Sequence, residues 1–154
     1  MLDSVIVARP FITATQEILV TMAGMDSAAG APFVKKNNIA KGDISAIVKV
    51  TGDKTGTIAV SFSRSCALAL VKGMLGDDIQ DALHDTQDAV GEMANMISGQ
   101  ARAALVNMGL DLKGSTPTVI VGKGHTISHL SAGPTIAIPF TTNYGEFTVE
   151  FCWL

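Results

Sequence analysis

Polar and apolar residues recur with a helical period between residues 85 and 107. At about 100° per residue, polar or small residues occupy roughly a quarter of the helix circumference, and apolar residues lie opposite. The polar quarter contains Asp88, Glu92, Asn95, Gly99 and Arg102. The apolar side contains Val90, Met93, Ile97, Ala101, Ala104 and Met108. The pattern predicts a helix, capped by Asp85 or Thr86 and ending at about Asn107, that packs on one face and offers the other to a partner.

Two further helices are predicted from apolar spacing and from start and stop signals. The first runs from residue 10 or 11 to about Gly24, and the second follows a cap at Ser63 or Ser65 and stops at Gly76. Residues 5–20 are hydrophobic, but they follow an acidic start (residues 1–3) and include polar or helix-breaking residues. These are Arg9, Pro10, Gln16 and Glu17. We therefore expect neither a signal peptide nor a membrane span.

Runs rich in β-branched residues or alternating with period two predict the strands. They cover residues 33–35, 44–51, 57–62, 118–121, 126–130, 134–140 and 146–153. The last run places Phe147, Val149, Phe151 and Trp153 on one face, and Thr148, Glu150 and Cys152 on the other. Because hairpin-length connections join most strands, the predicted fold class is α+β. We expect a mostly antiparallel sheet of about six strands packed with long helices, in a single domain spanning residues 1–154.

Each half of the chain opens with a long helix and continues into a β-hairpin, which hints at an internal pseudo-two-fold repeat. In that register Thr13, Glu17 and Val20 take the spacing of residues 88, 92 and 95, with valine in place of asparagine.

Composition narrows the class of partner. Hydrophobic residues make up 47% and charged residues 16% of the chain, which suggests extensive burial and favours a homo-oligomer. The net charge is -3 and the 11 Lys and Arg residues are scattered, so nucleic acid is not an expected partner. Cys66 and Cys152 lie among apolar neighbours and indicate reduced core thiols, which fits a cytoplasmic protein.

Other chemical motifs give little support for a site. His125 and His129 would share a face of a strand, but about 13 Å apart, and no further metal ligands accompany them. We expect no metal site. Residues 122–125 resemble half a phosphate loop without the following helix, so a turn is the better interpretation. The serines are not in a nucleophile elbow.

The triplet Asp88, Glu92 and Asn95 remains, and its spacing alone also fits an ordinary solvated helix face. Two details argue against that interpretation. Asparagine is a poor residue for a helix interior. Gly91 and Gly99 cost helix stability while lowering the steric profile around the triplet, which suits close approach by another protein.

Longer stretches of sequence carry a family resemblance. The arrangement D-x-x-x-E-x-x-N from Asp88 to Asn95 is followed by M-I-S-G-Q-A-R up to Arg102 and by P-T-V-I from Pro117. Further matching runs are G-D-I-S-A-I, V-S-F-S, M-L-G and G-P-T-I-A-I-P-F, which together span nearly the whole chain. In these motifs the chain resembles the CheX branch of the CheC/CheX/FliY chemotaxis phosphatases.

The resemblance implies an activity and a site. Proteins of this family remove the phosphoryl group from the aspartyl phosphate of the response regulator CheY, so phosphorylated CheY-type regulator is the expected partner. Asn95 would orient the attacking water, and Glu92 would contact the regulator at its active-site lysine. Asp88 and Pro117 would support the motif, and Gly91, Gly99 and Arg102 would contact the partner. Mg²⁺ would come from the regulator, and the protein would form a homodimer.

Two alternatives remain at the level of sequence. A non-catalytic module could dock on a response regulator or on the flagellar switch, although docking alone would not require the amide of Asn95. A structural or sensory domain could carry the same triplet as a solvated face.

Overall fold

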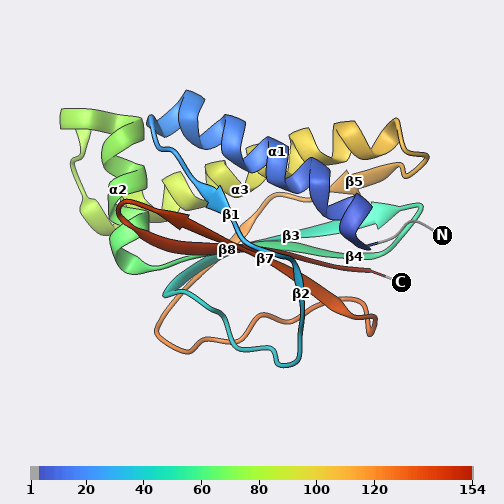
Figure 1. The fold of residues 1–154 in the computed structure, drawn as a ribbon. Coiled ribbons are helices and arrows are strands. Elements are labelled where there is room, and N and C mark those ends of the chain that lie inside the picture. Colours follow the sequence, from blue (N-terminus) through green and yellow to red (C-terminus); the bar gives the residue numbers. More distant parts are fainter. Residues whose placement is uncertain (1–3, 154) are drawn as a thin grey trace.

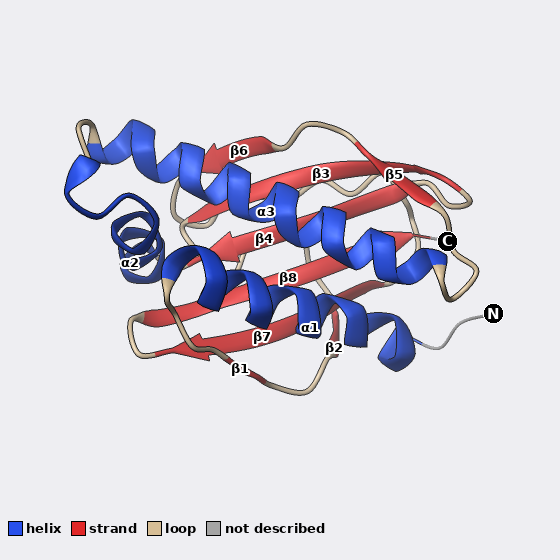
Figure 2. Cartoon of the chain, turned by 90° about the horizontal axis from the view of Figure 1, so that it is seen from above, coloured by secondary structure: helices blue, strands red, loops and turns tan. Residues whose placement is uncertain are grey.

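Helices α1 and α3 lie side by side on one face of an antiparallel sheet, and α2 stands across one end of the pair, in the computed structural model, which describes residues 4–153 (Figures 1 and 2). The acidic start at residues 1–3 lies outside this range. The helices are α1 (Ser4–Ala23), α2 (Arg64–Leu75) and α3 (Ala82–Val106), with a short 3-10 helix at Gly76–Asp78. The strands are β1 (Ala28–Ala29), β2 (Phe33–Lys35), β3 (Ile44–Gly52), β4 (Gly56–Phe62), β5 (Leu112–Gly114), β6 (Thr118–Val121), β7 (Thr135–Thr142) and β8 (Gly145–Trp153). The α+β prediction is confirmed.

The sheet has eight strands, where the sequence predicted about six. Its order is β1-β7-β8-β4-β3-β5, with β2 also pairing with β7 and β6 also pairing with β3. The short strands that follow α1 therefore pair with the hairpin of the second half, and those that follow α3 pair with the hairpin of the first. This reciprocal exchange is consistent with an internal pseudo-two-fold repeat, which stays a prediction.

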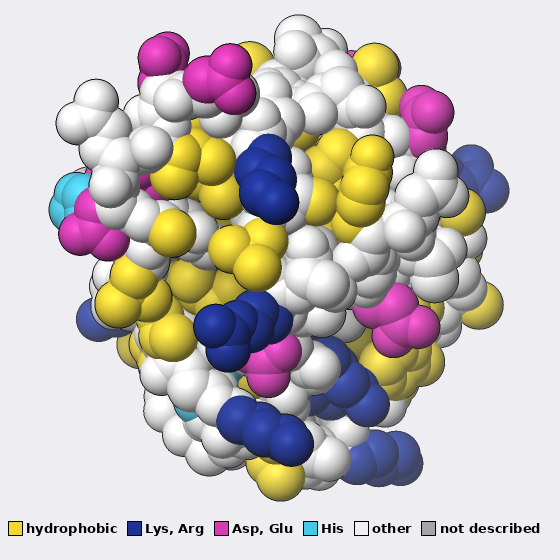
Figure 3. Space-filling view, turned by 90° about the vertical axis from the view of Figure 1, so that its left-hand side faces the viewer, with side chains coloured by type: hydrophobic (Ala, Val, Ile, Leu, Met, Phe, Trp, Pro, Cys, Tyr) yellow, Lys and Arg dark blue, Asp and Glu magenta, His cyan; other side chains and the backbone are white. Residues whose placement is uncertain are grey.

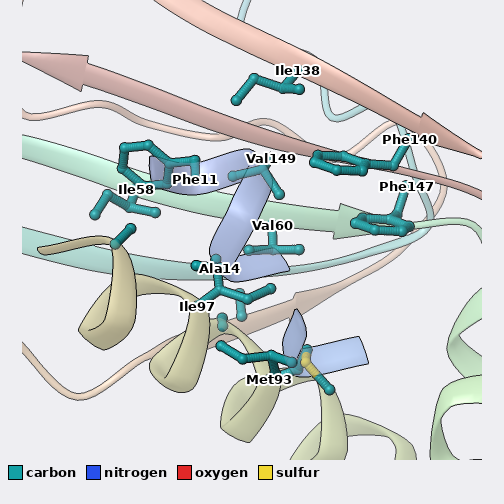
Figure 4. Close-up of a cluster of buried hydrophobic side chains, with 14 of the residues drawn as sticks. Phe11, Ala14, Ile58, Val60, Met93, Ile97, Ile138, Phe140, Phe147 and Val149 are labelled. Atoms are coloured by element: carbon teal, nitrogen blue, oxygen red, sulfur yellow. The ribbon is translucent and has the colours of Figure 1, made fainter. Parts of the chain in front are cut away.

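The helical side of the sheet contains the main core. Alternate residues of β8 point toward α1 and α3, as the period-two pattern predicted. Phe11 of α1 stacks on Phe151 at a centroid distance of 4.9 Å, and Phe147 stacks on Phe140 at 4.8 Å. Figure 4 shows Phe11, Phe140 and Phe147 with Ile97 and Met93 of α3. The buried face of α3 is thus fixed against strands from both halves of the chain.

Helix α1 passes the length and composition test for a membrane span, which a core helix of a soluble protein also passes. Phe11 and Leu19 are fully buried in the core on the sheet. The sequence placed the start of this helix too late, because the helix begins at Ser4 and contains Pro10. Proline in an interior turn removes one backbone hydrogen bond, and here core packing outweighs that local cost.

The opposite face of the sheet is covered by the loops that follow β2 and β6 (Figure 1). A small apolar cluster lies there, made of Ala40, Ile47, Ala59 and Ile127. The strand predicted at 126–130 is wrong, since Thr126 forms only an isolated bridge with Ile39. Two backbone hydrogen bonds to residues 38 and 40, together with side-chain contacts, hold this segment in place of a strand ladder. His125 Nε2 lies 2.7 Å from Ser45 Oγ, and His129 Nε2 donates to Glu150 Oε2 at 2.8 Å.

Candidate functional site

Capping interactions place the start of α3 four or five residues earlier than the sequence predicted. Asp81, rather than Asp85 or Thr86, is the N-cap and accepts a hydrogen bond from the His84 amide. Asp85 accepts hydrogen bonds from the amides of Gln80 and Asp81, at 2.9 and 3.2 Å. These two bonds hold the pKa of the Asp85 carboxyl below its usual value. The extra turn gives the triplet a helical support on its N-terminal side.

The triplet part of the expected polar face of α3 is confirmed as solvent-exposed, whereas Gly99 and Arg102 are half-buried. Asp88, Glu92 and Asn95 are all exposed, whereas Val90, Met93 and Ile97 are fully buried. Glu92 and Asn95 are one turn apart, about 4.5 Å along the helix axis and about 60° around it. Packing of the buried face of α3 in the core therefore fixes the direction in which Glu92 and Asn95 point into solvent.

The side chains of Glu92 and Asn95 have no hydrogen-bond or ion-pair partner within residues 4–153. Asp88 differs, because its Oδ2 atom lies 3.1 Å from His84 Nε2 one turn earlier. Both members of this pair are about two-thirds exposed, so the contact contributes little to stability. The carboxylate of Glu92 and the amide of Asn95 thus remain free for a partner.

Gly91 and Gly99 have different surroundings. A Cβ atom built at Gly91 would lie 3.3 Å from Cγ2 of Val119, so close packing between α3 and β6 explains this glycine. A Cβ atom at Gly99 would meet only Nη2 of Arg102, at 3.9 Å. Packing within the described chain therefore gives a reason for glycine at position 91 and none at position 99.

Arg102 is half-buried and makes contacts within the protein that the sequence did not predict. Its Nε donates to Ser98 Oγ at 3.0 Å, and its Nη1 donates to the Leu112 carbonyl at 3.4 Å. The guanidinium lies against Gly114 of β5, where a Cβ atom would come within 2.9 Å of it. Pro117 is half-buried immediately before β6, the strand beside α3.

A hollow lies near the N-terminal end of α3, and none of the triplet residues lines it. That hollow lies between α2 and the start of α3, and its wall includes Leu68, Leu83, Arg64 and Lys123. Figure 3 views the molecule from the side of α2 and shows hydrophobic side chains gathered around Lys and Arg residues. Leu83 is nine residues before Glu92, on the opposite side of the helix. The site is a convex helix face and has no pocket of its own.

His125 and His129 do not form a site with the triplet. They lie on the other face of the sheet, in separate hydrogen-bonding groups with Ser45 and with Glu150. No group of three or more potential metal ligands occurs within residues 4–153. Sequence reasoning missed the buried pair of Lys35 Nζ and Glu150 Oε1, which are 2.9 Å apart. A charged residue inside an otherwise apolar or small-residue strand was the available signal.

Comparison with known proteins identifies the family. The sequence profile of the chemotaxis phosphatase CheX family matches residues 44–141, a range that includes the triplet, Gly91, Gly99, Arg102 and Pro117. This chain belongs to the CheX family. The family match agrees with the resemblance carried by the helix motif and the strands around it.

Three similar proteins extend the comparison. CheX from Desulfovibrio desulfuricans has a crystal structure with 63% identity and a TM-score of 0.91, covering 96% of this chain and 99% of that one. The CheY-P phosphatase CheX of Thermotoga maritima is 24% identical over 136 residues, which are 88% of this chain and 86% of that protein. A CheX–CheY–BeF3–Mg²⁺ complex from Borrelia burgdorferi shares the fold, with 22% identity, a TM-score of 0.77 and coverage of 94% and 95%.

Proposed function

We propose that this protein hydrolyses the aspartyl phosphate of a CheY-type response regulator in chemotaxis signalling. In the proposed complex, Glu92 and Asn95 enter the active site of the regulator. The main supporting observation is the combination of exposed, unpartnered side chains with a helix whose other face is fully buried. Membership of the CheX family and similarity to a CheY-P phosphatase support the reaction. The Borrelia relative with this fold forms a complex with CheY.

The chemistry needs few protein groups. The oxygen of a water molecule forms a bond to phosphorus while the bond from phosphorus to the aspartyl oxygen breaks. The products are inorganic phosphate and the free carboxylate, and the water proton passes to phosphate or solvent. An acyl phosphate is already activated, and its transfer passes through a loose transition state, so placing the water in line is the main task. A side-chain amide can orient water without changing its own protonation state.

Asn95 takes the role of orienting this water, because its amide offers both a donor and an acceptor. Glu92, one turn earlier, contacts the active-site lysine of the regulator and fixes the depth and angle of docking. The rigid attachment of α3 to the sheet supports both roles, because the two side chains enter the complex with little backbone freedom to lose. Asp88 and Pro117 support the position of the helix and of the edge strand beside it.

Mg²⁺ in this proposal comes from the regulator and neutralises charge on the phosphoryl group there. The complex of the Borrelia relative contains Mg²⁺ together with CheY and BeF3. In the proposed complex, Glu92 and Asn95 are the two residues of this chain that enter the reaction centre. The homodimer expected from the sequence stays a prediction, and the mass of the protein in solution tests it.

Phosphate release from a phosphorylated CheY-type regulator of the same organism tests the proposal. Wild-type protein should accelerate release, and Asn95→Ala should reduce the acceleration about a hundredfold or more, as for loss of a group that acts in the transition state. Binding of the Asn95→Ala variant to the regulator should change little. Glu92→Lys should weaken binding and catalysis together. Wild-type turnover by Asn95→Ala would refute the mechanism.

The non-catalytic docking module predicts a different result in the same assay. Wild-type protein would bind the activated regulator without increasing the rate of phosphate release. Asn95→Ala would then be indistinguishable from wild type in every measurement.

A further inference from the structure

The guanidinium of Arg102 is held at a fixed place with one nitrogen uncommitted. Nε and Nη1 are used by Ser98 Oγ and the Leu112 carbonyl, whereas Nη2 has no hydrogen-bond acceptor within residues 4–153. Arginine loses considerable side-chain freedom when it binds a ligand. In this protein the two internal hydrogen bonds have already removed much of that freedom, so the Nη2 donors are preorganised.

Two glycines flank this nitrogen. A Cβ atom would lie 2.9 Å from Nη2 if built at Gly114, and 3.9 Å from it if built at Gly99. Gly114 makes room for the guanidinium on the strand side. On the helix side, a residue with a long side chain at position 99 would cover the nitrogen. Gly99 weakens the helix without a packing reason of its own, so its benefit lies outside the isolated chain.

Arg102 lies on the same side of α3 as Asn95. Seven residues separate them, which corresponds to about 10 Å along the axis and about 20° around it. A regulator that receives Asn95 at its phosphorylation site would cover this part of the helix with the rim of that site. The acidic residues Asp88 and Glu92 lie toward the N-terminal end of this helix face, and the Arg102 guanidinium lies toward its C-terminal end.

We propose that Arg102 is a specificity-determining contact that donates from Nη2 to a carboxylate on the rim of the regulator's active site, through the opening left by Gly99. The inference rests on the proposed function, because it needs the regulator to dock on α3. It explains why a half-buried arginine with internal hydrogen bonds lies beside two glycines. It also assigns Gly99 a role that differs from the packing role of Gly91.

The test compares Arg102→Gln and Gly114→Ala with the control Lys113→Gln, which removes the same charge one residue away from Gly114. Arg102→Gln removes the cation, and Gly114→Ala displaces the guanidinium without altering α3. For each protein we would measure the Kd for a CheY-type regulator of the same organism activated with beryllofluoride and Mg²⁺. KM and kcat for phosphate release, and the midpoint of thermal unfolding, would be measured alongside.

Arg102→Gln and Gly114→Ala should each raise Kd and KM about tenfold, the change expected for loss of one charge-assisted hydrogen bond, and leave kcat within about twofold. Lys113→Gln should change Kd by less than about twofold. The Kd of wild type should rise more steeply with salt than that of Arg102→Gln.

Unchanged Kd in both folded variants would overturn the inference, as would an equal effect of Lys113→Gln. A fall in kcat that follows the fall in thermal midpoint would assign Arg102 a purely structural role and would also overturn it. Wild-type protein that neither binds the regulator nor speeds phosphate release would refute the proposed function and the inference together. Wild-type activity with unaffected variants would refute the inference alone.

Discussion

Two carboxylates, Glu92 and Glu150, have opposite surroundings in this protein. Glu150 is completely buried on the loop-covered face of the sheet, where Lys35 and His129 both donate to it and His129 also bonds to the Thr57 hydroxyl. Glu92 is exposed on α3 and has no partner within residues 4–153. The buried carboxylate stabilises the fold by satisfying its neighbours, and the exposed one is available to another protein. The fully partnered carboxylate of Glu150 therefore has a structural role, and the unpartnered carboxylate of Glu92 belongs to the candidate site.

Removing each carboxylate gives the largest expected contrast. Glu150→Ala leaves Lys35 as an uncompensated buried charge, so we expect the free energy of unfolding to fall by about 3–5 kcal/mol. Glu92→Ala, the matched control on the surface, should change it by no more than about 0.5 kcal/mol. Urea unfolding of the two variants measures the difference, and similar losses would contradict the comparison. The double variant Lys35→Met/Glu150→Leu should recover much of the lost stability, because no unpaired charge remains.

Acid should reduce the contribution that the ionised Glu150 carboxylate makes to the free energy of unfolding. Burial alone raises the pKa of Glu150, but hydrogen bonds and positive charge from His129 and Lys35 hold it below its usual value. A carboxyl with a lowered pKa in the folded state contributes stability above its unfolded pKa, about 4.3, and that contribution is lost as the pH falls. Wild-type stability should therefore decline below about pH 5.

Glu150→Gln provides the control for this pH dependence. The variant should be less stable than wild type at pH 7 and should approach it as the pH falls toward 3, when urea midpoints are measured across the range. A constant gap at every pH would show that Glu150 does not titrate with folding. The Asp85 carboxyl, whose pKa is lowered by two backbone amides, should add a smaller effect in the same direction.

Substitutions at Gly91 and Gly99 of α3 distinguish a packing role from a role in docking the regulator. Gly99→Ala should raise the free energy of unfolding by about 0.5–1 kcal/mol, because alanine favours the helix and its Cβ meets only the end of Arg102. Gly91→Ala should gain less, since Val119 must shift to admit the new Cβ. Thermal unfolding measures both. If the outer face docks the regulator, Gly99→Leu should weaken binding while leaving the chain folded, and unchanged binding would argue against close approach at this position.

The smallest expected effect concerns the exposed pair of His84 and Asp88. His84→Ala should lower the free energy of unfolding by at most about 0.5 kcal/mol, because solvent screens a pair that is mostly exposed. A loss comparable to that of Glu150→Ala would mean that the exposed face also contributes to the fold. Phosphate release by His84→Ala should stay close to wild type, since this residue only adjoins Asp88.

Much of the fold could be predicted because its signals are local. The alternation along β8 and the helical period of α3 identified their buried faces correctly. Ser63 was one of the two caps proposed from sequence, and the hairpin-length connection between β3 and β4 was also expected. Both cysteines are buried and unpaired, as expected. The short strands β1 and β5 could not be predicted, because neither contains a β-branched or aromatic residue, unlike the short strand β2 (Phe33–Lys35), which was predicted. They form only where a neighbouring strand offers its edge.

The sequence by itself determined which residues face outward on α3, because helical geometry places Asp88, Glu92 and Asn95 on one side wherever the helix packs. Only the tertiary structure decided what surrounds them. It separated Gly91, which packs against Val119, from Gly99, which packs against little, and it anchored Arg102 to β5. It also joined Lys35 to Glu150 across 115 residues of chain. Such contacts depend on how distant segments meet, and no local pattern encodes that.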